Sequence, residues 1–518
     1  MQHPDYHVII LGGAFSGASL GCLLRRDHPE ARILVVERAE AFDRKVGEST
    51  SEVAAAFMTR VLRISHHLNR EHLVKQGLRL WFDDGPDCQL EECGEIGALY
   101  QSRLTTYQLD RSVLDEHLLA GAVDAGCELL RPAVVKGVEL EEGGLQKVTV
   151  EQGGESRTLT ARWVVDATGK AAMLARKLGH WRLVDSHPTK SMWGRFRGVR
   201  DLDGPEFEVA HPDIARRVRT ARDTATNHLT GRGWWCWIIP LRGGEVSFGL
   251  TYDPRYFEPA KGGTIFERLL KHARQTPVGR WMFAEAEGVG TDMRAYGHLP
   301  YRTEQLCGDG WMCIGDAAGF MDPLYSQGLD YCSHTVQAAR RLLGAHLGEA
   351  PACGAALADL NRQFAESYQR WFAALYEHKY AYVGDAELMQ AAFLMDLACY
   401  FIGPVRLVYD EPETEWFRMP YFGPAGAVFA RFMSFYNRRL AHLGNKRHAA
   451  GCYGRKNAES VLLIERGFVP DMKAMFRLLL RGAVIWVRAE MHGLTLRSGA
   501  EVPVPAGGGV MDAATGEV

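Results

Sequence analysis

The sequence has no long apolar segment and no large excess of either charge, and no more than one of its segments resembles a nucleotide-binding fingerprint. Its 60 lysines and arginines nearly balance 63 acidic residues, for a net charge of −3. That balance gives no electrostatic basis for binding nucleic acid or an anionic membrane. No apolar run reaches the roughly 20 residues of a membrane span. The nearest, residues 475–487, is interrupted by Arg477 and Arg481, which favours a buried amphipathic helix.

The 11 cysteines are scattered and form no CxxC pair and no Cys/His spacing typical of zinc sites. The sequence therefore predicts no metal site. No charged segment followed by an apolar stretch opens the chain, so a secretory signal is not expected. Together these features predict reduced thiols and a cytoplasmic protein.

Periodicity predicts a mixed α/β chain. Residues 7–12 and 33–37 are typical of buried parallel strands flanking a helix over 16–26, which forms a βαβ unit. Residues 234–241 and 245–252 are expected to be paired strands. Helical periodicity recurs over 330–347, 357–378, 386–401 and 428–442.

A glycine-rich turn follows the first expected strand: Gly12-Gly13-Ala14-Phe15-Ser16-Gly17. It departs from the GxGxxG fingerprint at Ala14, where the pattern has glycine. The second strand ends at Glu37-Arg38, where a carboxylate would bind a ribose hydroxyl. The helix that starts near Ser16 would offer amide groups to a pyrophosphate. The turn predicts a dinucleotide site, with a turn that binds no ligand as the alternative.

Three later segments follow in the order used by FAD proteins. They are Asp110-Arg111-Ser112-Val113-Leu114-Asp115, Asp166-Ala167-Thr168-Gly169 and Gly315-Asp316. The first is similar to the DRxxFD segment of that superfamily, and the last would place a carboxylate near the ribityl hydroxyls. The resemblance implies bound FAD on a doubly wound α/β sheet of the glutathione-reductase-like type, with a β-rich substrate domain and a helical C-terminal region.

The expected boundaries follow from these motifs. Residues 1–350 form the FAD-binding module, to which 180–300 contribute a β-rich substrate subdomain. Residues 351–500 form a helical region that caps the substrate site, and the Gly-, Ala- and Pro-rich residues 501–518 form a flexible tail. The aromatic residues of the helical region are typical of a bulky core or of a pocket for a planar substrate.

Four further segments carry a more specific resemblance. They are Gly47-Glu48-Ser49-Thr50, Lys75, the WxWxIP string from Trp235 through Trp237 to Pro240, and Asp322-Pro323-Leu324-Tyr325-Ser326-Gln327-Gly328. In this order they resemble the flavin-dependent halogenases, above all the free-standing branch that acts on aminopyrrolnitrin-type pyrroles and tetracycline-type phenols.

The resemblance implies a reaction typical of antibiotic and other natural product biosynthesis. Reduced FAD from a separate NAD(P)H-dependent flavin reductase reacts with O₂ to form a flavin hydroperoxide, and chloride or bromide attacks it to form hypohalous acid. Lys75 holds this acid as a haloamine, or hydrogen-bonds it, while an electron-rich phenol or pyrrole attacks. The aromatic substrate is free or carrier-bound.

The resemblance also assigns residues. Cofactor contacts are implied for the glycine-rich turn and Glu37-Arg38, and for Glu48, Ser49, Thr50, Arg111, Asp166, Gly169, Gly315, Asp316 and Gly328. A halide and flavin pocket is implied for Trp235, Trp237, Pro240, Pro323, Ser326, Gln327 and Gly328. The amides of Gln327 and Gly328, at the start of an expected helix, are the candidate halide donors.

Two departures from the family pattern lie near the expected site: the first, at Tyr325, concerns the partner of Lys75, and the second, at Ser51-Glu52, would reshape the loop near the flavin. The branch that halogenates free tryptophan has a glutamate at the position of Tyr325, which argues against free tryptophan as substrate and leaves the acid/base partner unnamed. Ser51-Glu52 stands where many relatives have an apolar residue and proline. An apolar setting would lower the pKa of Lys75, whose ammonium offers three donors. Lys75 as a surface lysine remains open, with Arg79 as a neighbouring cation.

Two other functions fit the same motifs. A flavin-dependent aromatic monooxygenase or oxidase of this fold would add oxygen to its substrate instead of halogen. A catalytically inactive flavoprotein would bind an aromatic ligand or a carrier protein and leave it unchanged. The mass of the product separates these possibilities.

Overall fold

The computed structural model describes residues 3–347, 354–409, 417–458, 460–465 and 471–496. Its first layer is an eight-stranded sheet with a parallel centre, in the order β18-β19-β10-β1-β2-β7, extended by β9 and β8. The strands are β1 (Tyr6–Leu11), β2 (Ile33–Val36), β7 (Glu128–Leu130), β8 (Val134–Glu139), β9 (Gln146–Gln152), β10 (Glu155–Asp166), β18 (Cys307–Gly308) and β19 (Trp311–Cys313).

The helices of this layer confirm the predicted βαβ start. Helix α1 joins β1 to β2, which pair in parallel, and it packs against α4 and α10. Both strands are buried on both faces, as expected for the centre of a parallel sheet. The helices near this sheet are α1 (Phe15–Asp27), α2 (Glu52–Ala56), α3 (Ser65–Glu71), α4 (Arg111–Asp124), α5 (Met173–Lys177) and α10 (Gly328–Ala345).

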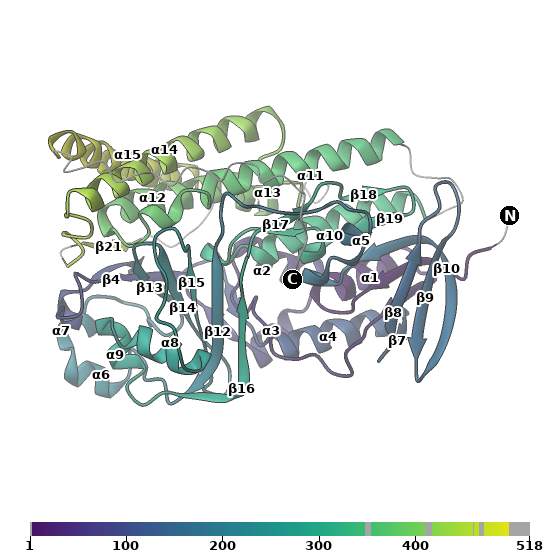
Figure 1. Ribbon diagram of the computed structural model, residues 1–518, viewed down its shortest axis with the longest axis horizontal. Coiled ribbons are helices and arrows are strands. Elements are labelled where there is room, and N and C mark those ends of the chain that lie inside the picture. The colour runs from purple at the N-terminus through teal and green to yellow at the C-terminus, as the bar shows by residue number, and fades with distance from the viewer. Residues whose placement is uncertain (1–2, 348–353, 410–416, 459, 466–470, 497–518) are drawn as a thin grey trace, which may run out of the picture.

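A second eight-stranded sheet forms the β-rich layer, in the order β16-β12-β15-β14-β13-β4-β5-β21. Helices α6 to α9 lie beside it at the lower left of Figure 1. Its strands are β4 (Leu78–Phe82), β5 (Gly94–Ala98), β12 (Lys190–Arg197), β13 (Thr226–Gly231), β14 (Trp234–Pro240), β15 (Val246–Tyr252), β16 (Glu287–Tyr296) and β21 (Val461–Ile464). The helices are α6 (Pro205–Ala210), α7 (Pro212–Ala215), α8 (Ile265–Ala273) and α9 (Pro277–Met282).

This sheet extends beyond the 180–300 boundary drawn from the sequence. Strand β4 pairs in parallel with β13, and β21, from the region expected to be helical, pairs in parallel with β5. The predicted hairpin of β14 and β15 is confirmed. Short sheets complete the structure: β3 (Leu73–Lys75) with β6 (Thr106–Gln108), and β11 (Trp181–Leu183) with β17 (Tyr301–Thr303) and β20 (Gly319–Phe320).

The C-terminal helices form the third layer and lie across the top of Figure 1, above the two large sheets. The predicted helices over 357–378, 386–401 and 428–442 are present, the last one longer than expected. They are α11 (Gly354–Leu375), α12 (Ala386–Tyr400), α13 (Arg406–Tyr409), α14 (Gly423–Ala449) and α15 (Met472–Thr495). The tail expected at 501–518 lies outside the described residues.

Two expectations about apolar segments need correction. The stretch Ala386–Tyr409 is long and apolar enough to cross a membrane, but 72% of its most apolar window is buried inside the molecule, as in a core helix. The segment 475–487 is helical within α15, but only Met475 and Gly482 in it are buried, because a spacing of three and four residues gathers apolar side chains on an outer face. These exposed residues are Phe476, Leu480, Val484, Val487, Met491 and Leu494.

Candidate active site

The turn between β1 and α1 depends on two glycines. Gly12 has φ +100°, and a Cβ there would lie 2.5 Å from the carbonyl oxygen of Ala167. A Cβ on Gly17 would lie 1.9 Å from the carbonyl oxygen of Gly12. Ala14 has φ −77°, which any residue adopts, so the missing fingerprint glycine costs the backbone nothing. The turn is therefore intact despite its departure from GxGxxG.

The start of α1 has no side-chain cap from its N-cap residue, Ala14, and no acidic residue in its first turn. The Asp115 carboxylate, from α4, accepts the Phe15 N–H at this end at 3.1 Å. Glu37 sits beside this helix start, where its Oε2 accepts a 2.8 Å hydrogen bond from the Gly13 N–H and its Oε1 accepts one from the Ala39 N–H. Arg38 is exposed on the adjacent surface.

The separate dinucleotide motifs meet at this turn. A Cβ on Gly315, whose φ is +58°, would lie 2.3 Å from Ser16 Oγ. The Phe15 N–H donates to Asp115, which also pairs with Arg111 at 3.1 Å. Asp316, next to Gly315, is half-buried, and desolvation raises its pKa. Glycines without room for a Cβ beside a helix start fit the pyrophosphate and ribityl chain of FAD.

The Asp166 carboxylate, a predicted cofactor contact, accepts hydrogen bonds within its own loop. Its Oδ1 accepts from the Thr168 N–H at 2.9 Å and its Oδ2 from the Leu174 N–H at 2.6 Å. Both oxygens are therefore used inside their own loop. Gly169, with φ +64°, completes the turn. The sequence pattern alone does not show whether an aspartate at this position shapes its loop or contacts a ligand.

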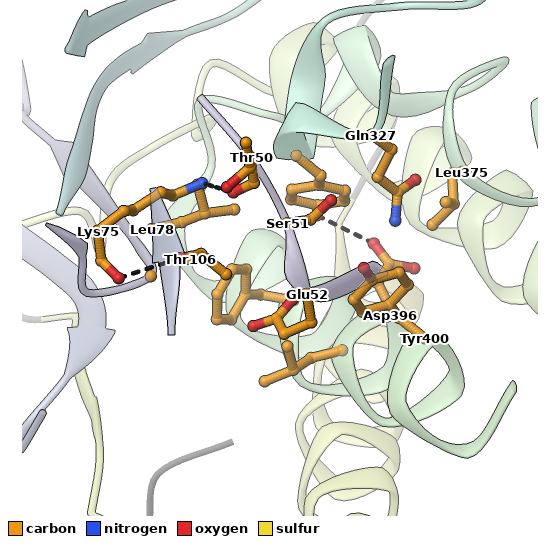
Figure 2. A pocket seen from close by; sticks show the side chains of 14 residues that line it. Thr50, Ser51, Glu52, Lys75, Leu78, Thr106, Gln327, Leu375, Asp396 and Tyr400 are labelled. Carbon is orange, nitrogen blue, oxygen red and sulfur yellow. Dashed lines mark hydrogen bonds between the residues drawn. The ribbon is translucent and has the colours of Figure 1, made fainter. Parts of the chain in front are cut away.

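A pocket lies between this module and the helical layer (Figure 2). The GEST segment, β3, β6, the 322–328 loop, α11 and α12 all contribute to it. Its walls are Thr50, Ser51, Glu52, Lys75, Gly77, Leu78, Thr106, Tyr325, Gln327, Leu375, Phe393, Asp396, Leu397 and Tyr400. The structure thus brings Lys75, GEST and the 322–328 loop together, as their resemblance predicts.

Lys75 is buried, with 2% of its surface exposed, at the end of β3. Its Nζ donates a 2.6 Å hydrogen bond to the carbonyl oxygen of Thr50 and lies 3.5 Å from Ser326 Oγ. Burial lowers the pKa of Lys75 to about 8, and the negative charge of Glu52 opposes that change. The alternative that Lys75 is a surface lysine is therefore wrong.

Arg79, the other candidate cation, belongs to a different cluster. It forms a buried ion pair with Glu95, and its Nη2 donates to the carbonyl oxygen of Ala98 at 2.8 Å. Arg222 also donates to Glu95, at 3.0 Å. Alternation along β4 directs Arg79 away from the pocket that its neighbour Leu78 lines.

The GEST segment is bonded to its surroundings along its length. Arg195 donates to Glu48 at 2.9 Å, and burial raises the pKa of Glu48 to about 7. The Thr50 N–H donates to the carbonyl oxygen of Tyr107 at 3.0 Å. Ser49 and Thr50 precede α2 and do not cap it, since its N-cap residue is Ser51.

The 322–328 loop is strained and tied to GEST. Tyr325 and Ser326 have φ of 68° and 62°, a conformation that costs of order 1–3 kcal/mol for each non-glycine residue. Ser326 Oγ donates to Ser49 Oγ at 3.1 Å, and Ser51 Oγ lies 3.3 Å from the Ser326 carbonyl oxygen. Helix α10 begins at Gly328, in line with the predicted helix start beside Gln327.

The tryptophans of the WxWxIP string share one face of β14, as their spacing predicts. Their ring centroids are 5.9 Å apart, and neither lines the pocket. Trp235 Nε1 donates to the Tyr380 hydroxyl at 2.9 Å, which donates to Asp322 Oδ2 at 2.9 Å. The string is therefore linked to the residue before Pro323. Trp237 Nε1 donates to Ser247 Oγ, and Pro240 ends β14.

Sequence reasoning missed three acidic groups around the pocket. Asp330 accepts hydrogen bonds from Ser51 and Tyr400, and burial raises its pKa to about 7. Asp396 pairs with Lys379 at 2.6 Å. Glu52 was noted only as a departure from its relatives. No linear pattern marks Asp330 or Asp396: Asp396 lines the pocket from α12, and Asp330, in α10, lies behind Ser51 and Tyr400.

The aromatic residues of the helical layer divide between core and pocket. Phe393 and Tyr400 line the pocket, whereas Trp371 and Tyr376 lie behind it and donate to Gln327 Oε1 at 2.9 and 2.8 Å. The aromatic residues thus supply both core packing and pocket wall, and the planar substrate stays a prediction. Among the described residues, no cluster of three or more His, Cys, Asp or Glu side chains could hold a metal, and ten cysteines are free.

Comparison with known proteins agrees with this geometry. Residues 209–382 match the tryptophan halogenase family. The tetracycline 7-halogenase of Kitasatospora aureofaciens is 27% identical over 67% of this chain and 65% of its own length. The flavin-dependent halogenase chlA of Dictyostelium discoideum is 24% identical over 67% of this chain and 61% of its own length. The chain thus spans somewhat less than two thirds of either relative.

Solved structures extend the similarity of fold. The halogenase PltM, in complex with phloroglucinol and FAD, superposes with a TM-score of 0.74 at 16% identity, over 94% of this chain and 99% of that one. The flavin-dependent brominase Bmp2 gives 0.63 at 20% identity, over 84% and 99%. These neighbours confirm the predicted α/β fold with a β-rich and a helical region. By sequence, this chain is similar to flavin-dependent halogenases over these stretches, and it shares the fold of the solved halogenases.

Proposed function

We propose that this protein halogenates an electron-rich aromatic small molecule of the phenol or pyrrole type, using FADH₂, O₂ and chloride or bromide. The observation that carries the proposal is Lys75, a lysine with a pKa of about 8 buried in a pocket beside the 322–328 loop. A lysine that only stabilised the fold would pair with a carboxylate at close range. Lys75 instead bonds a backbone carbonyl and leaves donor capacity for a ligand.

FAD would occupy the cradle formed by the turn of Gly12 to Gly17, Glu37, Arg111, Gly315 and Asp316. Reduced FAD, when bound there, supplies with O₂ the oxidant that converts halide to hypohalous acid. The amides of Gln327 and Gly328, at the start of the 18-residue helix α10, are suited to hold the halide. The sequence has no second dinucleotide fingerprint, which supports a separate NAD(P)H-dependent flavin reductase as the source of FADH₂.

Lys75 has two possible roles toward hypohalous acid, and its pKa permits either. At pH 7 a group with a pKa of 8 is about nine-tenths protonated, so the ammonium can donate to the leaving hydroxyl. The remaining tenth is free amine, which could form a haloamine. The apolar walls at Leu78, Leu375 and Phe393 would keep water away from either species.

The substrate would enter the same pocket. Phe393 and Tyr400 offer aromatic surface, and Thr106 and Glu52 offer polar contacts at the wall. Helices α11 and α12 supply several wall residues, which supports a substrate-capping role for the helical region. The free cysteines fit a protein that acts in the reducing cytoplasm. A free aromatic substrate can be assayed as a small molecule, whereas a carrier-bound substrate must be supplied on its carrier protein.

Product mass tests this function. The protein is incubated with FAD, a flavin reductase, NADH, O₂ and bromide, together with phenols, pyrroles and indoles. Because bromine has two abundant isotopes, a brominated product gives a paired mass signal. A gain of one oxygen without bromine would support the monooxygenase instead. Unchanged substrate throughout the panel, with FAD bound and reoxidised, would support a flavoprotein that only binds its ligand.

A further inference from the structure

We propose that Glu52 is the base of this pocket, and that it accepts the proton that the aromatic ring loses as the carbon–halogen bond forms. The inference rests on the proposed halogenation and names the acid/base partner of Lys75. Tyr325 stands where the tryptophan-specific branch has its glutamate, so the carboxylate here must come from another segment. Glu52 follows directly on the GEST motif.

Position supports this assignment. Glu52 is the first residue of α2, only 8% of its surface is exposed, and it lines the same pocket as Lys75. Figure 2 shows its side chain between the Lys75 side of the pocket and the side formed by Asp396 and Tyr400. A buried carboxylate with this exposure is rare unless it is paired or functional.

The other nearby carboxylates are already engaged. Asp330 Oδ1 accepts from Ser51 Oγ at 2.6 Å and from the Ala54 N–H at 2.8 Å, and its Oδ2 accepts from the Tyr400 hydroxyl at 2.9 Å. Within the described chain, no other residue donates a hydrogen bond to the Glu52 carboxylate. Glu52, which accepts only from its own backbone, therefore keeps more free acceptor sites than Asp330.

Asp396 is engaged in the same way. Its Oδ2 accepts from Lys379 Nζ at 2.6 Å and from the Tyr325 hydroxyl at 3.0 Å. Its Oδ1 accepts from the Tyr436 hydroxyl at 2.5 Å. The partnered ammonium of Lys379 also stabilises its anion. Asp396 thus holds Tyr325 in place, and Glu52 is the pocket carboxylate that can receive a proton.

Electrostatics makes Glu52 and Lys75 a matched pair. Burial raises the pKa of Glu52, while the positive charge of Lys75 opposes the rise. Burial lowers the pKa of Lys75, and Glu52 opposes that fall. The two pKa values are shifted toward each other, so the free-energy difference between a proton on Glu52 and a proton on Lys75 is smaller than for free side chains.

The reaction balances with these two residues. The ring carbon attacks the halogen of hypohalous acid, the oxygen–halogen bond breaks, and the departing hydroxide takes a proton from the Lys75 ammonium to become water. The ring then loses its proton to the Glu52 carboxylate and regains aromaticity. Transfer of that proton from Glu52 to the neutral Lys75 amine restores both groups. The sum is arene plus hypohalous acid giving haloarene plus water.

Kinetic isotope effects test the assignment on a phenol that the wild-type protein brominates, deuterated at the brominated carbon. With the base in place, proton loss is fast and the isotope effect stays near unity. In Glu52→Gln, we expect bromination to slow by about 10²-fold or more and a primary isotope effect to appear, because proton loss becomes limiting. Flavin reoxidation should keep its rate.

Two further variants serve as controls. Glu52→Asp should recover part of the activity, and Glu40→Gln, at an exposed glutamate, should match the wild type.

A second readout needs no turnover. The ¹³C shift of the Lys75 side chain, followed against pH, should give a lower pKa in Glu52→Gln than in the wild type, because the anion that favours the ammonium is gone. Glu52→Gln with wild-type bromination and no isotope effect would overturn the assignment while leaving the proposed function standing. A wild-type protein that brominates nothing would instead remove the proposed function itself.

Discussion

Lys75 and Thr50 are joined by a 2.6 Å hydrogen bond from the lysine Nζ to the threonine carbonyl oxygen. This contact connects the lysine of β3 to the last residue of GEST, 25 residues earlier in the chain. Because the acceptor is a neutral carbonyl, the ammonium is oriented without being neutralised. The lysine is therefore held in position and still able to donate to, or react with, a ligand.

The pH dependence of halogenation should separate the two roles open to Lys75. If its ammonium is the proton donor, product per flavin turnover stays level at neutral pH and falls about tenfold per unit above its pKa of about 8, as the donor is lost. If its free amine forms a haloamine, the product instead rises with pH up to about 8. We expect the fall, measured as brominated product against FADH₂ consumed.

The control for that profile is Lys75→Arg. A guanidinium stays protonated throughout the range, so any product made by this variant should show no fall near pH 8. A fall that persisted unchanged in Lys75→Arg would assign the titration to another group.

The link from Trp235 through Tyr380 to Asp322 should matter for halide binding. Tyr380→Phe removes the hydroxyl between Trp235 and Asp322, so we expect a loss of about 1–3 kcal/mol in stability and a raised KM for bromide. FAD affinity should change little. Tyr382→Phe is the matched control, because that hydroxyl bonds Asn437 instead of the loop. Equal effects of the two variants on the bromide KM would contradict the link.

The β1–α1 turn gives a prediction for cofactor binding. Gly12→Ala places a Cβ 2.5 Å from the Ala167 carbonyl oxygen at φ +100°, so we expect a protein that is destabilised and purifies with little FAD. Ala14→Gly restores the fingerprint glycine at a position without strain and should bind FAD as the wild type does. Flavin absorbance per protein measures both. Full flavin occupancy in Gly12→Ala would show that the cradle lies elsewhere.

Local patterns predicted the parts of the fold that depend on local interactions. The β1–α1–β2 unit has continuous apolar strands and a glycine turn, and both act over a few residues. The parallel pairing of β4 with β13 was not predictable, since these adjacent strands, Leu78–Phe82 and Thr226–Gly231, are far apart in the sequence. Strand β21, in a region dominated by helices, was missed for the same reason.

The site divides in the same way. Lys75, GEST and the 322–328 loop were recognised because each is a short motif. The carboxylates of Asp330 and Asp396 were missed because helix packing, not spacing, brings them near the pocket. The sequence also did not predict that Arg79 is buried in an ion pair, because its partner Glu95 is identified only by the structure. Residues whose function depends on distant partners carry no local signal.

The most direct test compares brominated product from the wild type and from Lys75→Ala under identical reductase, bromide and substrate conditions, with flavin reoxidation recorded in both. We predict a paired bromine mass signal from the wild type, its loss in Lys75→Ala, and nearly equal flavin reoxidation. Brominated product at the wild-type rate in Lys75→Ala would contradict the role of Lys75, and oxygenated product from both proteins would contradict halogenation.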